Sequence, residues 1–317
     1  MESGAAMCAV RQVFVLSYLE KPDPASLPAL LQTEGKCRFI PIPTAVQEKW
    51  RLDGECCLLM ENLEDGNFYH FIARHYCWNQ NIPIRRIHFH SELGGGNTIC
   101  DVLKKCVSKE KTPVLCLVDS DRKHGVTKSF PNPPATGGTL DRAQKVSDEL
   151  SGMDGLPPHC LFALHVHEIE NLIPLQLMEA LKPTPAMHPG LAIASRLRQV
   201  RGGEPLLYYD FKKGFPYIKG KPGRAYWGEI LQELGGDEAS MPAGVKLKPG
   251  TYQPELLFFP PLSCNLLRNV LGHIQAAEQN HEPIHETLRV DDYLKAIWDD
   301  VGIQMLTWGY ASEPMRA

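Results

Sequence analysis

The segment PVLCLVDSD, residues 113–121, gives the clearest indication of the fold, and the other segments are interpreted in relation to it. It opens with an apolar run that is typical of a buried strand, and two acidic residues follow the run. Similar runs occur at CCLLM (56–60), IPIRRIHFH (82–90) and CLFALHV (160–166), and helix-like spacing of apolar residues fills the sequence between them. Strands that alternate with helices predict an α/β fold with a mainly parallel sheet flanked by helices.

The character of the sequence changes beyond Pro174. Residues 176–235 have helical spacing with a basic loop inside, and residues 236–262 are rich in proline and glycine. Two amphipathic helices are predicted after that, around Leu266–Ile274 and Tyr293–Val301. We therefore expect an α/β domain at 1–175 with an N-terminal extension, and a mostly helical C-terminal domain at 176–317. Two weaker strand candidates lie in the extension, VFVLSY (13–18) and CRFIPI (37–42).

The composition is that of an ordinary globular protein. Of the 317 residues, 43% are hydrophobic and 22% are charged. Because no apolar run reaches the roughly 18 residues of a membrane span, no membrane association is expected. The N-terminus has no basic segment of the kind that opens a secretion signal. The ten cysteines are scattered without a CxxC pair, which favours reduced thiols and a cytoplasmic location.

The net charge of −4 does not by itself indicate a nucleic-acid binder. One segment has the opposite sign, because eight Lys and Arg residues lie between Arg196 and Arg224, against only Glu204 and Asp210. This segment is either a solvated basic surface or a stretch that faces phosphates, and the sequence leaves both open.

Acidic residues follow three of the predicted strands. Because the carboxyl ends of parallel strands lie at one edge of a sheet, the three pairs can converge although they are distant in the sequence. Carboxylate oxygens are the ligands that Mg²⁺ and Mn²⁺ prefer, and two such ions can promote in-line displacement at phosphorus. The pairs are Glu61 and Asp65, Asp119 and Asp121, and Glu168 and Glu170.

Each pair also has an ordinary structural explanation. Asp65 can cap a helix, and Glu61 can lie in a surface turn. An Asp-Ser-Asp sequence after a strand is a common loop, and Glu168 with Glu170 can begin a solvated helix. It is the occurrence of all three pairs in one α/β unit that favours a metal site.

The order of these motifs resembles the TOPRIM domain. That domain has Glu-x-x-x-Asp after one strand, a glycine-bearing turn after the next, and Asp-x-Asp after the third. Here the matching residues are Glu61 and Asp65, Gly94–Gly96, and Asp119 with Asp121. The segment HEIENLIP (167–174) is similar to the OLD-like and DUF4435-like branch, which includes nuclease partners of ABC-type ATPases in phage defence.

The resemblance implies roles for individual residues. Glu61 would be a metal ligand or general base, and Asp119 and Asp121 would hold Mg²⁺ or Mn²⁺, with two ions expected. Asp65 and one of Glu168 or Glu170 would complete the ligand set. The segment DFKKG (210–214) resembles the position of a lysine that contacts the scissile phosphate, either Lys212 or Lys213. Gly95 and Gly96 would either bind phosphate through backbone amides or form a permissive turn.

The sequence also departs from the family pattern. Asn62 replaces the usual glycine after the catalytic glutamate, and Arg122 and Lys123 replace a further acidic pair of the topoisomerases. No Walker A motif is present, so an ATPase activity would come from an ABC-like or SMC-like partner chain. The region after the TOPRIM-like unit would then serve partner docking, dimerisation or substrate selection.

Three functions remain as hypotheses. The first is a metal-dependent endonuclease that cuts DNA or RNA, acting as the toxic effector of a defence system. The second is an interaction subunit with a degenerate site. This hypothesis is kept because Asn62 replaces the glycine that is usual after the catalytic glutamate. The third is a phosphatase or phosphotransferase that uses Asp-x-Asp as nucleophile and acid, ranked lower because such enzymes have that motif after the first strand and here it follows the third. The zincin-like HEPIH (281–285) is disfavoured because Pro283 interrupts the helix that the pattern needs.

Overall fold

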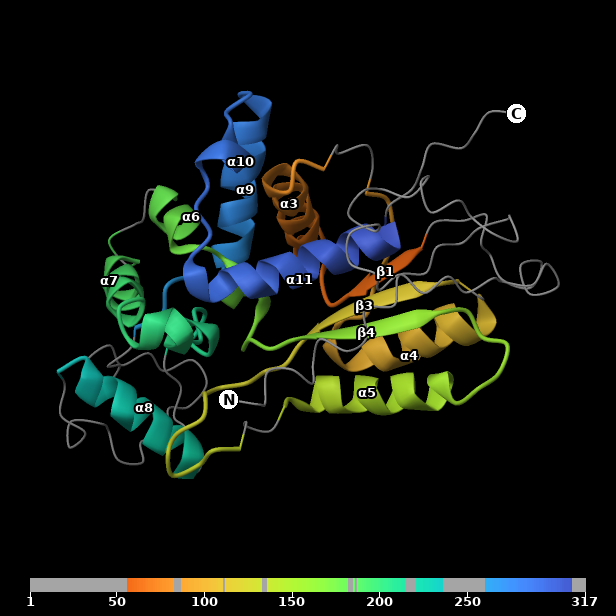
Figure 1. The fold of residues 1–317 in the computed structure, drawn as a ribbon, viewed down its shortest axis with the longest axis horizontal. Coiled ribbons are helices and arrows are strands. Elements are labelled where there is room, and N and C mark those ends of the chain that lie inside the picture. The colour runs from red at the N-terminus through yellow and green to blue at the C-terminus, as the bar shows by residue number, and fades with distance from the viewer. Residues whose placement is uncertain are drawn as a thin grey trace.

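The computed structural model contains a four-stranded, fully parallel sheet (Figure 1). It describes residues 56–82, 87–110, 112–132, 136–181, 185, 187–214, 221–235 and 260–309. The spatial order of the strands is β2-β1-β3-β4, which confirms the predicted α/β class with a parallel sheet. The strands are β1 (Cys57–Met60), β2 (His90–Leu93), β3 (Val114–Asp119) and β4 (His159–Leu164).

Helices cover both faces of this sheet. Figure 1 shows α4 and α5 along one face, with α3 and α11 on the other. The bounds are α3 (Leu63–Asn79), α4 (Ile99–Lys104), α5 (Gly138–Ser151) and α11 (Asp292–Gly309). A short 3₁₀ turn, Gly96–Thr98, leads into α4, and a π-helical turn, Lys105–Lys109, follows it.

Alternate strand residues sort onto the two faces, as the pleat of a strand requires. Leu58 and Leu115 belong to the core formed with α3 and α11. Cys57 and Val114 belong to the smaller core formed with α4 and α5. Because β1 and β3 are covered on both faces, they are apolar at every position except the last residue of β3.

The position of β2 differs from the sequence prediction. The expected strand was IPIRRIHFH (82–90), of which residues 83–86 lie outside the described residues, and the described strand β2 is His90–Leu93. Its register pairs Cys57 with His90 and Met60 with Leu93. Pairing with β1 therefore carries β2 beyond His90, where the predicted segment ended, to Leu93.

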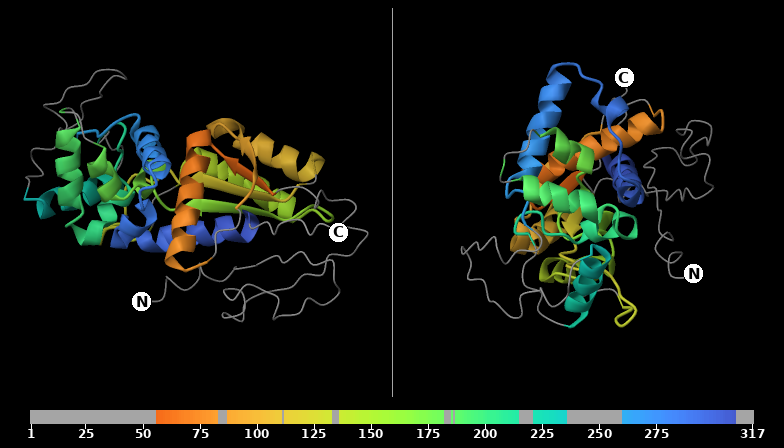
Figure 2. Two further views of the ribbon diagram at one scale, coloured as in Figure 1. Left: turned by 90° about the horizontal axis from the view of Figure 1, so that it is seen from above. Right: turned by 90° about the vertical axis from the view of Figure 1, so that its left-hand side faces the viewer.

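The C-terminal region is mostly helical, as predicted, and much of it lies beyond one end of the sheet (Figure 2). Trp298 of α11 packs edge-on against Phe68 and Phe71 of α3, so the main core continues across residue 175. The proposed division at 175 stays a prediction. The elements here are α6 (Leu175–Ala180), α7 (His188–Leu197), α8 (Lys221–Glu233), α9 (Leu266–Gln279) and α10 (Ile284–Thr287), with 3₁₀ segments at Ile169–Leu172 and Arg201–Leu207.

Several predicted features fall elsewhere. The strand candidates at 13–18 and 37–42, and nearly all of the proline- and glycine-rich segment, lie outside the described residues. Within the described part of the chain, no helix combines the length and the apolar character that crossing a membrane needs.

Candidate functional site

A cleft of about 390 Å³ lies at the carboxyl ends of β1 and β3. All six acidic residues that were predicted to converge line it, together with Lys212. We call this group the carboxylate cleft: Glu61, Asp65, Asp119, Asp121, Glu168, Glu170 and Lys212. The start of α9 contributes a further wall through Asn265, Leu267 and Arg268.

The end of β1 presents Glu61 and Asp65 to the cleft through a capped helix start. Asn62 is the N-cap of α3, with extended backbone angles of φ −136° and ψ 157°. Asp65 accepts hydrogen bonds from the backbone N–H of Asn62 at 3.0 Å and from its side-chain amide at 3.4 Å. Asp65 therefore sits three residues after the N-cap rather than at it. Because the angles of Asn62 are open to any residue, the missing glycine causes no strain here.

The end of β3 presents Asp119 and Asp121. Asp119 is the last residue of the strand, and its Oδ2 accepts a hydrogen bond from the backbone N–H of Ile169 at 3.1 Å. Asp121 has a φ of 53°, so the segment is not extended as expected, yet both carboxylates line the cleft. A side chain at Gly137 would overlap the carboxylate of Asp121, so this glycine allows the close approach.

The segment after β4 is held in place by Asn171, which is 1% exposed. Its Oδ1 accepts from the backbone N–H of Glu168 at 2.8 Å. Its amide donates to the carbonyl oxygens of Leu206 at 2.6 Å and Tyr209 at 2.8 Å. One buried side chain thus joins the segment that carries Glu168 and Glu170 to the segment that leads to Lys212.

The structure distinguishes between the two candidate lysines. Nζ of Lys212 lies 3.1 Å from Oε2 of Glu168 and 3.0 Å from Oε1 of Glu170, inside the cleft. The side chain of Lys213 is 69% exposed, and its Nζ lies 3.9 Å from Asp210. Asp210 accepts hydrogen bonds from the backbone N–H groups of both lysines, which fixes the turn between them.

The predicted phosphate-binding glycines do not reach the cleft. Gly95 and Gly96 are absent from its lining, and both have positive φ, 50° and 53°. The N–H of Gly95 donates to the carbonyl oxygen of Glu61 at 3.2 Å, so that amide already has a partner. Of the two interpretations, the structure favours the permissive turn, because the backbone here needs conformations that glycine adopts without strain.

Crowding of the carboxylates changes their protonation. The pKa of Asp65 is raised to about 7, mainly by burial and also by the nearby Glu170 and Glu61, while hydrogen bonds from Asn62 oppose the shift. Burial and the same neighbours raise the pKa of Asp119 well above its ordinary value. The pKa values of Glu61 and Glu170 are also raised by burial, and Lys212 opposes both shifts. Negative charge therefore exceeds positive charge in this cleft.

These residues fit a hard divalent cation. The ligand set is made of carboxylate oxygens, which suits Mg²⁺ or Mn²⁺. Oε2 of Glu170 is buried and has no hydrogen-bond partner among the described residues, so it is available as a ligand. A bound cation would also relieve the mutual repulsion that raises the carboxyl pKa values.

Most of the basic segment is occupied by contacts within the chain. Arg201 pairs with Glu229 and Glu233, and Arg198 pairs with Asp291. Of the described side chains in this segment, Lys212 lines the cleft. Of the described basic residues in this segment, Lys212 is therefore the one placed to contact a phosphate in the cleft.

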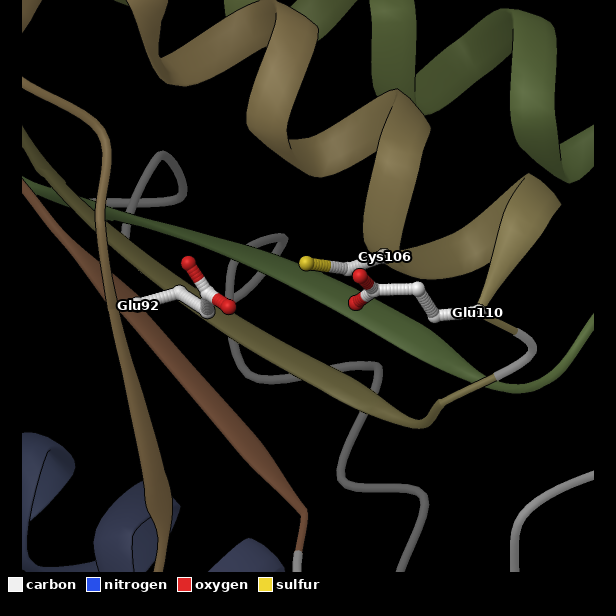
Figure 3. Close-up of side chains that lie close together, drawn as sticks. All are labelled: Glu92, Cys106 and Glu110. Carbon is white, nitrogen blue, oxygen red and sulfur yellow. The ribbon is translucent and has the colours of Figure 1, made fainter.

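Another group with ligand chemistry lies away from the cleft. Glu92 of β2 points toward Cys106 and Glu110, and their ligand atoms lie within 4.8 Å of one another (Figure 3). Nζ of Lys105 already lies 3.0 Å from Glu110 and 3.8 Å from Glu92. Because this lysine compensates the two carboxylates, the group does not require a metal ion. The HEPIH pattern does not form one helix, since α10 begins only at Ile284.

Comparisons of the chain with protein-family models, with curated proteins and with solved structures gave no significant match. The function has to be inferred from the residues of the site.

Sequence reasoning missed three contributors to the site. Arg268 lines the cleft and binds Glu64, with 2.6 Å between its Nε and Oε1 of Glu64, across 204 positions of sequence. Gly137 and Asn171 act through contacts that no local pattern encodes.

Proposed function

We propose that the protein is a metal-dependent endonuclease that hydrolyses phosphodiester bonds in nucleic acid. The observation that carries this proposal is the convergence of six carboxylates and Lys212 in one cleft, from segments after three parallel strands. An oxygen-only ligand set beside a lysine suits a phosphate substrate bridged to divalent cations. The resemblance to TOPRIM nucleases points to the same chemistry.

Each residue has a role in this proposal. Asp119, Asp121, Asp65 and Glu170 would hold Mg²⁺ or Mn²⁺, with Glu168 at the margin of the group. When bound, such cations supply Lewis-acid polarisation of the phosphate and activation of water. Glu61 would accept a proton from the attacking water, because its raised pKa makes it a better base than an ordinary carboxylate.

Lys212 would stabilise the negative charge that develops on the phosphate. Its Nζ already faces the cleft from between Glu168 and Glu170, so a phosphate can approach it there. Preorganised positive charge stabilises such a transition state more than a solvated side chain can. Lys213 projects away from the cleft and has no equivalent role.

The wider biological role rests on the resemblance alone. We propose that the chain acts as the toxic effector of an anti-phage system in the cytoplasm, with an ABC-like or SMC-like ATPase as partner, and that it self-associates. The alternative is an interaction subunit with a degenerate site, for which Asn62 was the reason; its backbone angles are ones that any residue adopts, which supports the nuclease proposal.

The test is a nuclease assay with Mg²⁺ or Mn²⁺ on DNA, tRNA and total RNA. The wild-type chain should cut at least one substrate, and Glu61→Ala should not. Glu149→Gln, which changes a distant carboxylate on α5, is the matched control and should retain activity. Equal activity of Glu61→Ala and wild type, with the fold intact, would overturn the proposal and favour an interaction subunit.

A further inference from the structure

A second group of ligand atoms shares Glu168 with the carboxylate cleft. One ring nitrogen of His167, one oxygen of Glu168 and one oxygen of Asp210 lie within 4.8 Å of one another. We call this group the histidine site. His167 and Asp210 do not line the carboxylate cleft, so the histidine site extends beyond it.

We propose that the histidine site binds its own divalent transition-metal ion, of the Mn²⁺ or Zn²⁺ type. Glu168 would then contribute to both this ion and the cations of the carboxylate cleft. Only this shared role of Glu168 rests on the proposed nuclease function.

The spacing of the ligand atoms suits an ion better than it suits a hydrogen bond. Nε2 of His167 lies 3.6 Å from Oδ2 of Asp210. That separation exceeds the roughly 2.7–3.2 Å of a good hydrogen bond. Two ligands that each lie about 2.0–2.2 Å from one ion are separated by similar distances of somewhat over 3 Å.

His167 is also buried with one of its two ring nitrogens lacking a hydrogen-bond partner among the described residues. His167 is 3% exposed, and its Nδ1 has no hydrogen-bond partner among the described residues. A buried polar nitrogen is normally satisfied, so an unpartnered one within a ligand group indicates a missing interaction. Because Nε2 is the nitrogen near Asp210, an ion bound there would leave Nδ1 to a water, since metal-binding histidines usually have a partner at the second ring nitrogen.

Hydrogen bonds hold all three ligands in place. The backbone N–H of His167 donates to the carbonyl oxygen of Leu207 at 2.8 Å. Oδ1 of Asp210 accepts from the N–H groups of Lys212 and Lys213, so its Oδ2 remains directed at the histidine. Asn171 fixes the backbone of Glu168. A preorganised ligand set needs little rearrangement to accept an ion.

The chemistry of the ligands predicts which ion binds. Imidazole nitrogen suits Zn²⁺, whereas Mg²⁺ prefers the oxygen-only ligands of the carboxylate cleft. Mn²⁺ suits carboxylate oxygens, which both sites contain, so it serves as a probe of either site. Nζ of Lys212 lies 3.1 Å from Glu168, and Nζ of Lys213 lies 3.9 Å from Asp210. An incoming ion would therefore compete with both lysines for these carboxylates. The exposed Lys213 can turn into solvent, and Lys212 would be released toward a phosphate in the cleft.

Pulsed electron paramagnetic resonance of the full chain with Mn²⁺ alone tests this site, because it detects ¹⁴N coupling to the metal. We expect a histidine-type ¹⁴N signal in the wild-type protein and its loss in His167→Gln. The signal should persist in His165→Gln, which changes the neighbouring histidine outside the group. Absence of the signal from wild type, or its survival in His167→Gln, would overturn the proposal.

Two further arms keep the result decisive. If His167→Gln fails to fold by circular dichroism, Asp210→Asn replaces it, and the bound Mn²⁺ should fall by one equivalent per chain. Unchanged stoichiometry in a folded Asp210→Asn protein would count against the site. Asp119→Asn should retain the ¹⁴N signal while it loses nuclease activity. A retained signal in a wild-type chain without nuclease activity would support the histidine site and reject only the proposed function.

Discussion

The carboxylate of Asp119 accepts a hydrogen bond from the backbone N–H of Ile169, at 3.1 Å, across 50 positions of sequence. This contact joins the end of β3 to the segment that carries Glu168 and Glu170. Because the backbone N–H of Ile169 binds the Asp119 carboxylate, this side chain is held in position in the cleft before any substrate arrives. The geometry of the site therefore depends on the loops after the strands as well as on the sheet.

Asp119→Asn should abolish cleavage without unfolding the protein. The amide keeps an oxygen that can accept from Ile169, but it removes a charged ligand from a crowded group. We expect activity to fall about 100-fold or more, because loss of one major electrostatic contribution costs that much in other enzymes. The melting temperature in EDTA should hold or rise, since repulsion from Glu61 and Asp65 is relieved. A large fall in melting temperature would contradict the predicted repulsion.

Lys212→Ala should reduce turnover more than it reduces metal binding. The variant removes the positive charge closest to Glu168 and Glu170, and we expect a loss of about 100-fold in kcat. Lys213→Ala is the matched control, because its exposed side chain adjoins in sequence but lies outside the cleft. Equal losses in the two variants, measured by steady-state kinetics and by Mn²⁺ titration, would remove the distinction between the lysines.

Gly137→Ala should displace Asp121 and weaken metal binding. The added methyl group would overlap the carboxylate of Asp121, and overpacking of this kind costs about 1–3 kcal/mol. Gly138→Ala is a close control, because a Cβ there meets no atom within 4 Å. Calorimetric titration with Mn²⁺ should show weaker binding for Gly137→Ala alone. Indistinguishable affinities would show that Asp121 is not a ligand or that it moves freely.

Stability in EDTA should decrease as the pH rises from about 4 to about 7. The pKa of Asp65 is raised to about 7 in the folded protein, against an ordinary carboxyl value near 4. The folded state therefore binds this proton more tightly than the unfolded chain does, and the stabilisation is lost as the proton leaves. Melting temperatures at pH 5, 6, 7 and 8 measure the slope, which should flatten in Asp65→Asn.

The same proton competes with the cation. Mn²⁺ affinity should increase as the pH rises through about 7 in the wild-type protein, because the ligands must be deprotonated to bind metal. A flat affinity between pH 6 and pH 8 would place Asp65 outside the ligand set.

Asn171→Ala should destabilise the protein and separate Lys212 from the glutamates. The variant leaves the N–H of Glu168 and two carbonyl oxygens without their partner, at roughly 1–3 kcal/mol for each buried group that stays unsatisfied. Urea denaturation measures the loss. Asn280→Ala, at the exposed end of α9, should change stability much less. Similar losses in both variants would argue against a special role for Asn171.

Local sequence patterns were enough to predict the fold class and the acidic residues of the cleft. Buried strands are recognised in the sequence as apolar runs. Acidic residues that follow such runs lie at one edge of a parallel sheet, and this does not depend on the connecting segments. Glu61, Asp119 and Glu170 could be proposed for this reason. The end of β2 could not, because pairing with β1 carries the strand past His90 to Leu93.

Only the tertiary structure decided which neighbours complete the site. Lys212 and Lys213 are adjacent and chemically identical, so their roles separate only when Asp210 fixes the turn and Asn171 brings that turn to Glu168. Gly95 and Gly96 belong to a glycine-rich segment like those of phosphate-binding loops. The backbone N–H of Gly95, however, donates its hydrogen bond to the carbonyl oxygen of Glu61, so it is not free to bind a phosphate. Contacts of this kind join segments that are tens to hundreds of residues apart, and a one-dimensional pattern holds no information on which of them form.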